Sequence, residues 1–201
     1  VAALGEQWRG GGRGFDNIVM VTLGTGVGGG IIMNGKILTG ENGAAGEIGH
    51  ITVNPKETLT CGCGCKGCLE QYSSATGVIR LAKERLEASD KPSELRKFAD
   101  DEIGGKEVFD AYKAGDELAL EIVDTQARIL GRALAQIACV VDPEIFVIGG
   151  GVSKAGSILT DSVKKYFEHY AFHACRQTKF ALAQLGNDAG IYGSACSILG
   201  R

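Results

Sequence analysis

Apolar residues in the first part of the chain form short runs of strand length. One run occupies residues 17–23, and a second apolar stretch, 31–38, is interrupted by Asn34 and Gly35. This Asn-Gly pair is typical of a two-residue type I′ hairpin, because both residues tolerate a positive φ. The pattern predicts a strand meander over residues 17–39, with a glycine loop joining its first two strands.

Beyond residue 73, apolar residues recur every three or four positions, which is the spacing of one face of a helix. Apolar runs at 144–148 and 179–183 break this pattern and predict two further strands. A meander followed by alternating strands and helices indicates an α/β fold with a mixed sheet. The expected helices are 1–9 (the end of a helix, which Gly10 stops), a helix capped by Ser73 or Ser74, 94–98, 116–142, 156–170, and one capped by Asn187 or Asp188 that ends at Leu199.

The composition limits the classes of function. With 201 residues, 44% of them hydrophobic, the chain is long enough for one large domain or two small ones with a real core. A net charge of −3 argues against a clustered positive surface, so no nucleic-acid partner is expected. The apolar runs are too short to cross a bilayer and no signal peptide is visible, which predicts a cytoplasmic protein with no membrane partner.

Four of the seven cysteines, Cys61, Cys63, Cys65 and Cys68, lie within eight residues. Such crowding in a cytosolic chain indicates a metal site rather than a disulfide framework. Zinc takes four N or S ligands, and His50 lies eleven residues before the first of these thiols. The spacing leaves two ligand sets open: His50 with three thiolates, or the four thiolates alone. The remaining cysteines, Cys139, Cys175 and Cys196, are expected to be buried small hydrophobes.

Two glycine-rich segments follow predicted strands. The first, 24–30, contains the pattern Gly-x-Gly-x-x-Gly, but a strand rather than a helix follows it, and no Gly-Lys-Ser/Thr completes a Walker A loop. It is either a tight turn or a turn whose backbone N–H groups approach a phosphate, with Thr25 as a hydroxyl donor. The second, 149–151, lies between a strand and a helix, where ligands of open α/β sheets bind. Close packing of helix on strand explains it equally well.

Two glutamates flank the cysteine cluster. Glu47 lies three residues before His50, and Glu70 lies two residues after Cys68, so folding the metal loop brings both carboxylates near one place. An imidazole that binds zinc through one nitrogen can donate a hydrogen bond from the other, and carboxylates accept hydrogen bonds from hydroxyl groups. The set suits a polyhydroxyl ligand such as a sugar.

Four motifs occur in order: Leu-Gly-Thr-Gly-Val-Gly-Gly-Gly at 23–30, Gly-Glu-Ile-Gly-His at 46–50, Cys-x-Cys-Gly-x-x-Gly-Cys-x-Glu at 61–70 and Ile-Gly-Gly-Gly-Val-Ser at 148–153. Together they resemble the ROK family of bacterial sugar kinases and repressors, most closely its zinc-containing glucokinases. The resemblance extends over essentially the whole chain, and its zinc motif is highly specific. It implies the large lobe of a ribonuclease H-like (actin/hexokinase-like ATPase) α/β fold, in which two lobes close over glucose and ATP.

The resemblance also implies roles for individual residues. It implies that a structural zinc ion is held by His50, Cys61, Cys63 and Cys68, with Cys65 at a variable position. It implies sugar contacts by Glu47, His50 and Glu70. It further implies phosphate contacts by Gly24, Thr25, Gly26, Val27 and Gly28, and contacts on the adenosine side by Gly149, Gly150 and Gly151. ATP is expected to enter as its Mg²⁺ complex.

Two motifs of the family do not occur in the chain. Family members carry an N-terminal Asp-x-Gly-Gly-Thr phosphate motif and then an Asn-Asp segment whose aspartate is the general base. Residues 1–6 resemble the sequence that follows that segment, so the catalytic aspartate is expected just before Val1 and no catalytic residue is expected in the chain. The other aspartates considered, Asp16, Asp142 and Asp188, lie in no comparable context.

The expected division follows from this resemblance. Residues 1–14 are expected to end an interlobe helix, and residues 15–201 to form the C-terminal lobe, with a zinc loop at 50–70. The expected activity is ATP-dependent phosphorylation of glucose to glucose 6-phosphate, with this chain inactive when separated from an N-terminal lobe. A homodimer is a further expectation, because relatives commonly pair.

Two alternatives remain open at this point. The chain could be the sugar-sensing effector lobe of a ROK transcriptional repressor, which an upstream helix-turn-helix would indicate. It could also belong to a kinase for N-acetylmannosamine, N-acetylglucosamine or fructose. The intact glycine loop at 24–28 favours a kinase, since a repressor need not bind phosphate.

Overall fold

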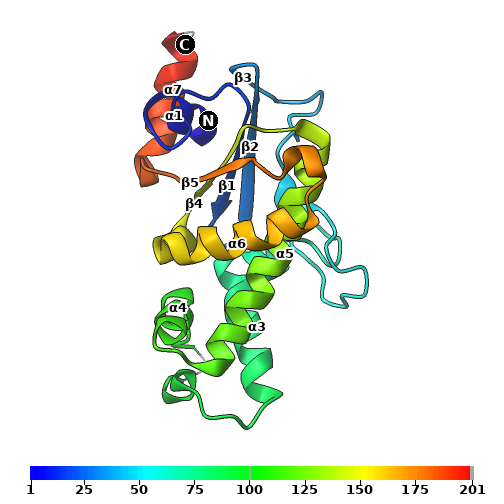
Figure 1. Ribbon diagram of the computed structural model, residues 1–201, viewed down its shortest axis with the longest axis vertical. Coiled ribbons are helices and arrows are strands. Elements are labelled where there is room, and N and C mark those ends of the chain that lie inside the picture. The colour runs from blue at the N-terminus through cyan, green and yellow to red at the C-terminus, as the bar shows by residue number, and fades with distance from the viewer. Residues whose placement is uncertain (100, 200–201) are drawn as a thin grey trace.

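The computed structural model describes residues 1–99 and 101–199, which contain a five-stranded mixed sheet (Figure 1). The strand order is β3-β2-β1-β4-β5; β1, β2 and β3 are antiparallel neighbours, while β4 and β5 extend the sheet from β1 in parallel. The predicted α/β class and mixed sheet are therefore confirmed. The strands are β1 (Ile18–Leu23), β2 (Val27–Met33), β3 (Lys36–Ile37), β4 (Ile145–Gly149) and β5 (Lys179–Leu182).

The meander forms as predicted, but β2 begins earlier than expected. The strand starts at Val27, so three glycines assigned to the loop belong to the strand, and Gly28 pairs with Thr22 of β1. Asn34 and Gly35 take φ angles of 50° and 74°, as a type I′ hairpin requires. The glycine loop itself is therefore shorter than the sequence suggests.

Close packing on both faces explains the glycines inside β2. A Cβ atom at Gly29 would lie 2.3 Å from the carbonyl oxygen of Gly46, and one at Gly30 would lie 2.8 Å from Cβ of Ala3. Both distances are far below van der Waals contact, so a side chain would push the neighbouring segments away. These two glycines serve packing of the strand rather than a turn.

Helices cover both faces of the sheet, with α1 and α7 together on one side and α5 and α6 on the other (Figure 1). In β1, Val19 and Val21 face the larger core, whereas Ile18 and Met20 face the smaller core beneath α1 and α7. Burial on both faces explains why the sequence of this central strand is an almost continuous apolar run. The helices are α1 (Ala2–Arg9), α2 (Glu70–Ser73), α3 (Ala75–Glu87), α4 (Gly105–Lys113), α5 (Glu117–Val141), α6 (Ser157–Tyr170) and α7 (Ala189–Leu199).

Some helix predictions differ from the structure. The segment expected at 94–98 is only a 3₁₀ turn, Glu94–Lys97, while α2 and α4 were not expected. α2 is a single turn, too short to show a periodic pattern. α4 begins after Gly104 and lacks the Ser, Thr, Asp or Asn that usually marks a helix start. None of the helices in the described ranges is long and apolar enough to span a membrane.

Helix α5 ends as predicted, but one of its cysteines does not lie where it was expected. Asp116 caps the helix by accepting a hydrogen bond from the Ala119 N–H at 2.9 Å, and the helix ends at Asp142, which takes a φ of 44°. Cys139, in the last turn, is exposed, so the prediction of a buried thiol is wrong there. Cys175 and Cys196 are buried, as predicted.

A buried carboxylate ties the N-terminal helix to the far end of the sheet. Glu6 of α1 is fully buried, and its oxygens accept hydrogen bonds from the N–H groups of Gly11, Gln184 and Leu185 at 2.7–3.1 Å. Gln184 and Leu185 follow β5, about 180 residues away in the chain. This carboxylate therefore fixes where α1 lies against the sheet.

Candidate functional site

The predicted metal ligands come from a short 3₁₀ turn and the loop that follows it. His50 ends the turn Ile48–His50, and the thiols lie in the loop that leads to α2. One ligand atom from each of His50, Cys61, Cys63 and Cys68 lies within 4.8 Å of the other three. Cys65 is exposed and is not part of this group. Of the two possible ligand sets, the fold thus brings together the histidine with three thiols rather than the four thiols.

Two of the distances among these four atoms match those of a zinc site. Nδ1 of His50 lies 3.8 Å from Sγ of Cys61, and the Sγ atoms of Cys63 and Cys68 lie 3.6 Å apart. Zn–S bonds of about 2.3 Å and Zn–N bonds of about 2.0 Å give tetrahedral edges of roughly 3.5–3.8 Å. Burial raises the pKa of Cys68 to about 12, so a nearby cation is needed to hold that thiol as a thiolate ligand.

The three predicted sugar contacts lie around this cluster. Nδ1 of His50 faces the thiols, whereas its Nε2 lies 4.0 Å from Oε2 of Glu47. Glu70 begins α2, and its Oε1 lies 3.7 Å from Sγ of Cys61 while its Oε2 accepts a hydrogen bond from the Val27 N–H at 3.0 Å. Glu70 therefore touches both the cysteine cluster and the glycine loop.

The glycine loop after β1 rests against the start of α3. The Ala75 N–H donates to the Gly24 carbonyl at 2.7 Å, and the Thr76 hydroxyl donates to the Thr25 carbonyl at 2.5 Å. No atom would contact a Cβ at Gly24, and Thr25 is exposed, so this side of the loop is open. The Thr76 contact was not expected from the sequence, because the first turn of α3 and a loop about 50 residues away meet only in the fold.

The second glycine segment meets the first at the end of β1. Gly150 takes a φ of 88°, and a Cβ there would lie 2.5–2.6 Å from backbone atoms of Leu23, the residue before Gly24. Because β1 and β4 are parallel neighbours, their carboxyl ends place both glycine segments at one edge of the sheet. The two segments, 125 residues apart, thus form one backbone-lined surface.

Comparison with known proteins now identifies the family. A family model described as the ROK family matches residues 1–200. This chain belongs to the ROK family. The mixed sheet with flanking helices is the fold of ROK and actin-like sugar kinases, as a solved ROK glucokinase superposes with a TM-score of 0.87.

The chain is similar to both sugar kinases and a transcriptional regulator. The glucokinase of Halalkalibacterium halodurans is 50% identical over 96% of this chain and 59% of that protein. The structure of a ROK glucokinase from Streptomyces griseus in complex with glucose and AMPPNP is 39% identical over 96% of this chain and 64% of that chain. A ROK transcriptional regulator, a homolog of the E. coli MLC protein, is 31% identical with a TM-score of 0.85, over 96% of this chain and 48% of that one. The chain spans about three-fifths of the length of these glucokinases.

A cavity of about 470 Å³ adjoins the second glycine segment. It lies between Gly151 and α4, with Phe109 among its apolar lining residues and Lys106, Lys113 and Lys154 among the charged ones. None of the α4 residues was expected at the site. No local pattern marks them, since α4 itself was not predicted and reaches the glycine segment only through the tertiary fold.

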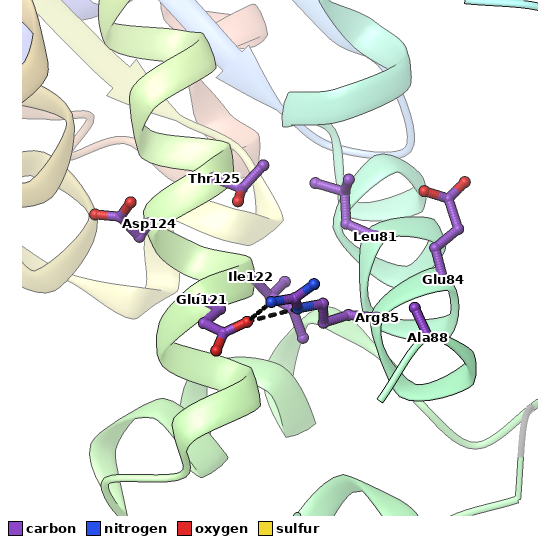
Figure 2. Close-up of a pocket in the computed structure, with 8 residues that line it drawn as sticks. All are labelled: Leu81, Glu84, Arg85, Ala88, Glu121, Ile122, Asp124 and Thr125. Atoms are coloured by element: carbon purple, nitrogen blue, oxygen red, sulfur yellow. Dashed lines mark hydrogen bonds and ion pairs between the residues drawn. The ribbon is translucent and has the colours of Figure 1, made fainter. Parts of the chain in front are cut away.

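Another hollow, of about 480 Å³, lies between α3 and α5 (Figure 2). Figure 2 shows Arg85 of α3 directed at Glu121 of α5, to which its guanidinium donates hydrogen bonds. None of the predicted site residues lines this hollow. The candidate site is therefore taken to be the edge where the His50 and cysteine cluster, the glycine loop and Gly149–Gly151 meet, since the predicted site residues lie there and not in this hollow.

Replacing Gly150 by alanine is expected to destabilise the chain by at least about 3 kcal/mol. The positive φ alone costs about 1–3 kcal/mol for an L-residue, and the new methyl group would overlap the Leu23 backbone. Gly151→Ala is the matched control, because nothing lies within 4 Å of a Cβ there. Urea unfolding of both variants measures the difference; equal midpoints for the two would contradict the close approach.

Proposed function

We propose that this chain is the C-terminal lobe of an ATP-dependent ROK glucokinase, which phosphorylates glucose to glucose 6-phosphate. The observation that carries the proposal is the position of Glu70. Its carboxylate lies between the His50 and cysteine cluster and the glycine loop, within 3.7 Å of one and hydrogen-bonded to the other. A sugar held at Glu70 would lie beside the loop proposed to hold the phosphates.

In this proposal, Glu47, His50 and Glu70 bind the sugar hydroxyls. Zinc held by His50, Cys61, Cys63 and Cys68 would be structural: when bound, it would fix the imidazole ring and its tautomer. Nε2 of His50, which faces away from the thiols, would then donate a hydrogen bond to a hydroxyl. The two carboxylates would accept hydrogen bonds from neighbouring hydroxyls and so orient the ring.

The nucleotide would lie on the surface formed by the two glycine segments. The segment Gly24–Gly28, which is open at Gly24, and the exposed Thr25 with its hydroxyl would approach the phosphates of ATP, which enters with Mg²⁺. The cavity between Gly151 and α4, which Phe109, Asp110 and three lysines help to line, would take the adenosine part. Phosphoryl transfer of this kind depends mainly on positioning and charge neutralisation.

The general base is proposed to come from outside this chain. By the resemblance to the family, it is an aspartate in the segment that precedes residue 1 in the complete enzyme, together with a first phosphate motif in an N-terminal lobe. We also propose a cytoplasmic location, because four thiols within eight residues stay reduced only in a reducing compartment.

The test compares this chain with the protein extended at its N-terminus to the length of its glucokinase relatives. We expect glucose-dependent ADP formation by the longer protein, and a rate lower by at least about 10⁴-fold for the 201-residue chain, since base and first phosphate motif would both be missing. A coupled assay of ADP measures both. Near-equal rates would contradict the proposal that the general base lies outside this chain. An inactive longer protein would contradict the proposed kinase activity.

The same assay decides between the alternatives. Activity with N-acetylmannosamine, N-acetylglucosamine or fructose in place of glucose would reassign the sugar. Sugar binding without ADP formation would favour the effector lobe of a repressor, to which the ROK transcriptional regulator among the relatives corresponds. The open glycine loop favours the kinase, because an effector lobe need not hold phosphate.

A further inference from the structure

A group of contacts separate from the cysteine cluster also holds the zinc loop. Its centre is Glu57, whose side chain is only 9% exposed. The Tyr72 hydroxyl donates to Oε2 of Glu57 at 2.5 Å, and Nη1 of Arg80 lies 3.2 Å from the same oxygen. The Thr58 and Leu59 N–H groups donate to Oε1 at 2.8 and 3.1 Å. The hydrogen bond from Tyr72, followed by those from the backbone, lowers the pKa of Glu57 to about 2, so the carboxylate stays ionised.

Gln71 continues these contacts on the other side of the loop. Its side-chain oxygen accepts from the Cys68 N–H and its amide nitrogen donates to the Leu59 carbonyl, both at 3.0 Å. Arg80, on α3, donates to the Gln71 carbonyl at 3.0 Å and lies over the ring of Tyr72 at 4.9 Å. We call the group of Glu57, Gln71, Tyr72 and Arg80 the Glu57 clamp.

The clamp holds the two residues that follow Glu70. α2 has only four residues, and a helix of one turn has no stability of its own, so its orientation depends on tertiary contacts. Gln71 and Tyr72 receive those contacts directly, and Glu70 precedes them in the same turn. Any rotation of α2 would move the Glu70 carboxylate away from the Val27 N–H, to which it is bonded at 3.0 Å.

We propose that Glu57 is a positioning residue for the sugar site, which sets the orientation of Glu70 through α2 without binding zinc or sugar itself. The inference rests on the proposed function for the role of Glu70. The zinc cluster anchors the loop at Cys61, Cys63 and Cys68, and the clamp anchors the turn that carries the carboxylate. The site therefore has two anchors, and in the second Glu57 contacts Thr58, Leu59, Tyr72 and Arg80, none of which is a proposed metal ligand.

Glu57→Gln and Glu84→Gln form a matched pair of variants. Both remove an ion pair with Arg80, but Glu84 is 52% exposed, lies on α3 and does not touch the zinc loop. Glu57→Gln also removes the charge that holds Tyr72. Tyr72→Phe serves as a second variant, since it deletes the hydroxyl and keeps the ion pair between Glu57 and Arg80.

The experiment measures steady-state kinetics of the longer protein and amide hydrogen exchange of the chain itself. For Glu57→Gln we expect the KM for glucose to rise about tenfold with kcat within about twofold, because binding of the sugar is lost equally in the ground and transition states. Zinc content should stay at that of the unmodified protein. Exchange across residues 68–73 should accelerate at least about tenfold. Tyr72→Phe should give a smaller change of the same kind, and Glu84→Gln none.

Two outcomes would overturn the inference. A Glu57→Gln protein whose KM and exchange match those of Glu84→Gln would show that the clamp does not position α2. A KM that rises only together with loss of zinc would show that Glu57 acts through the metal site. If Glu57→Gln does not fold, the same criteria apply to Tyr72→Phe. If the unmodified longer protein phosphorylates no glucose, the proposed function fails, and the exchange comparison decides on the clamp alone.

Discussion

Replacing Cys61 by serine is expected to abolish zinc binding and unfold the zinc loop. Cys61 is buried, its Sγ faces Nδ1 of His50 at 3.8 Å, and it belongs to the group of four ligand atoms. Structural zinc in small sites contributes roughly 10–16 kcal/mol of apparent folding free energy. Losing even a part of this is large against a total stability of about 5–15 kcal/mol. Metal analysis and thermal unfolding followed by circular dichroism measure the two effects.

The unmodified chain should hold one zinc ion, and Cys65→Ser is the control for Cys61→Ser. Cys65 is exposed and lies outside the group of ligand atoms, so its removal should change neither the zinc content nor the unfolding temperature. Zinc loss from the Cys65 variant together with zinc retained by the Cys61 variant would contradict the ligand set. A freshly purified, reduced protein without zinc would contradict the site altogether.

Replacing Glu6 by alanine is expected to destabilise the chain by at least about 4 kcal/mol. Glu6 is fully buried, and three backbone N–H groups, of Gly11, Gln184 and Leu185, would lose their charged acceptor from part-buried hydrogen bonds, at a cost of about 1–3 kcal/mol for each donor left unpaired. The cavity left by the side chain adds to this cost. We expect a lower urea midpoint, and faster amide exchange at residues 184 and 185 than elsewhere in the chain.

Glu144→Ala provides the comparison for Glu6→Ala. The Glu144 carboxylate likewise accepts from two backbone N–H groups, those of Asp16 and Asn17, but these hydrogen bonds are exposed. Water can replace the lost acceptor there, so the expected cost is only about 1 kcal/mol. Equal destabilisation by the two substitutions would mean that burial of Glu6 is not what makes its hydrogen bonds important.

The clearest local signals were confirmed. The Asn34-Gly35 hairpin, the long helix that begins near Asp116 and the apolar strands all depend on residues near one another in the chain, so their patterns are visible without the fold. Elements without such a signal were not predicted. α2 is a single turn, and α4 starts after a glycine. The glycines of β2 were assigned to a loop. Glycine is needed there because distant segments, at Ala3 and Gly46, pack closely against the strand, and the sequence does not show that contact.

The sequence by itself determined the family, the α/β class and a crowded set of candidate metal ligands, because these depend on residue type and short spacing. Only the tertiary structure decided how these parts meet. It grouped His50 with Cys61, Cys63 and Cys68, brought Gly150 onto the end of β1 and set Glu70 between the cluster and the glycine loop. It also revealed the Glu57 clamp and the buried Glu6. None of these contacts follows from the spacing of residues alone, because packing and burial determine which polar groups remain to pair.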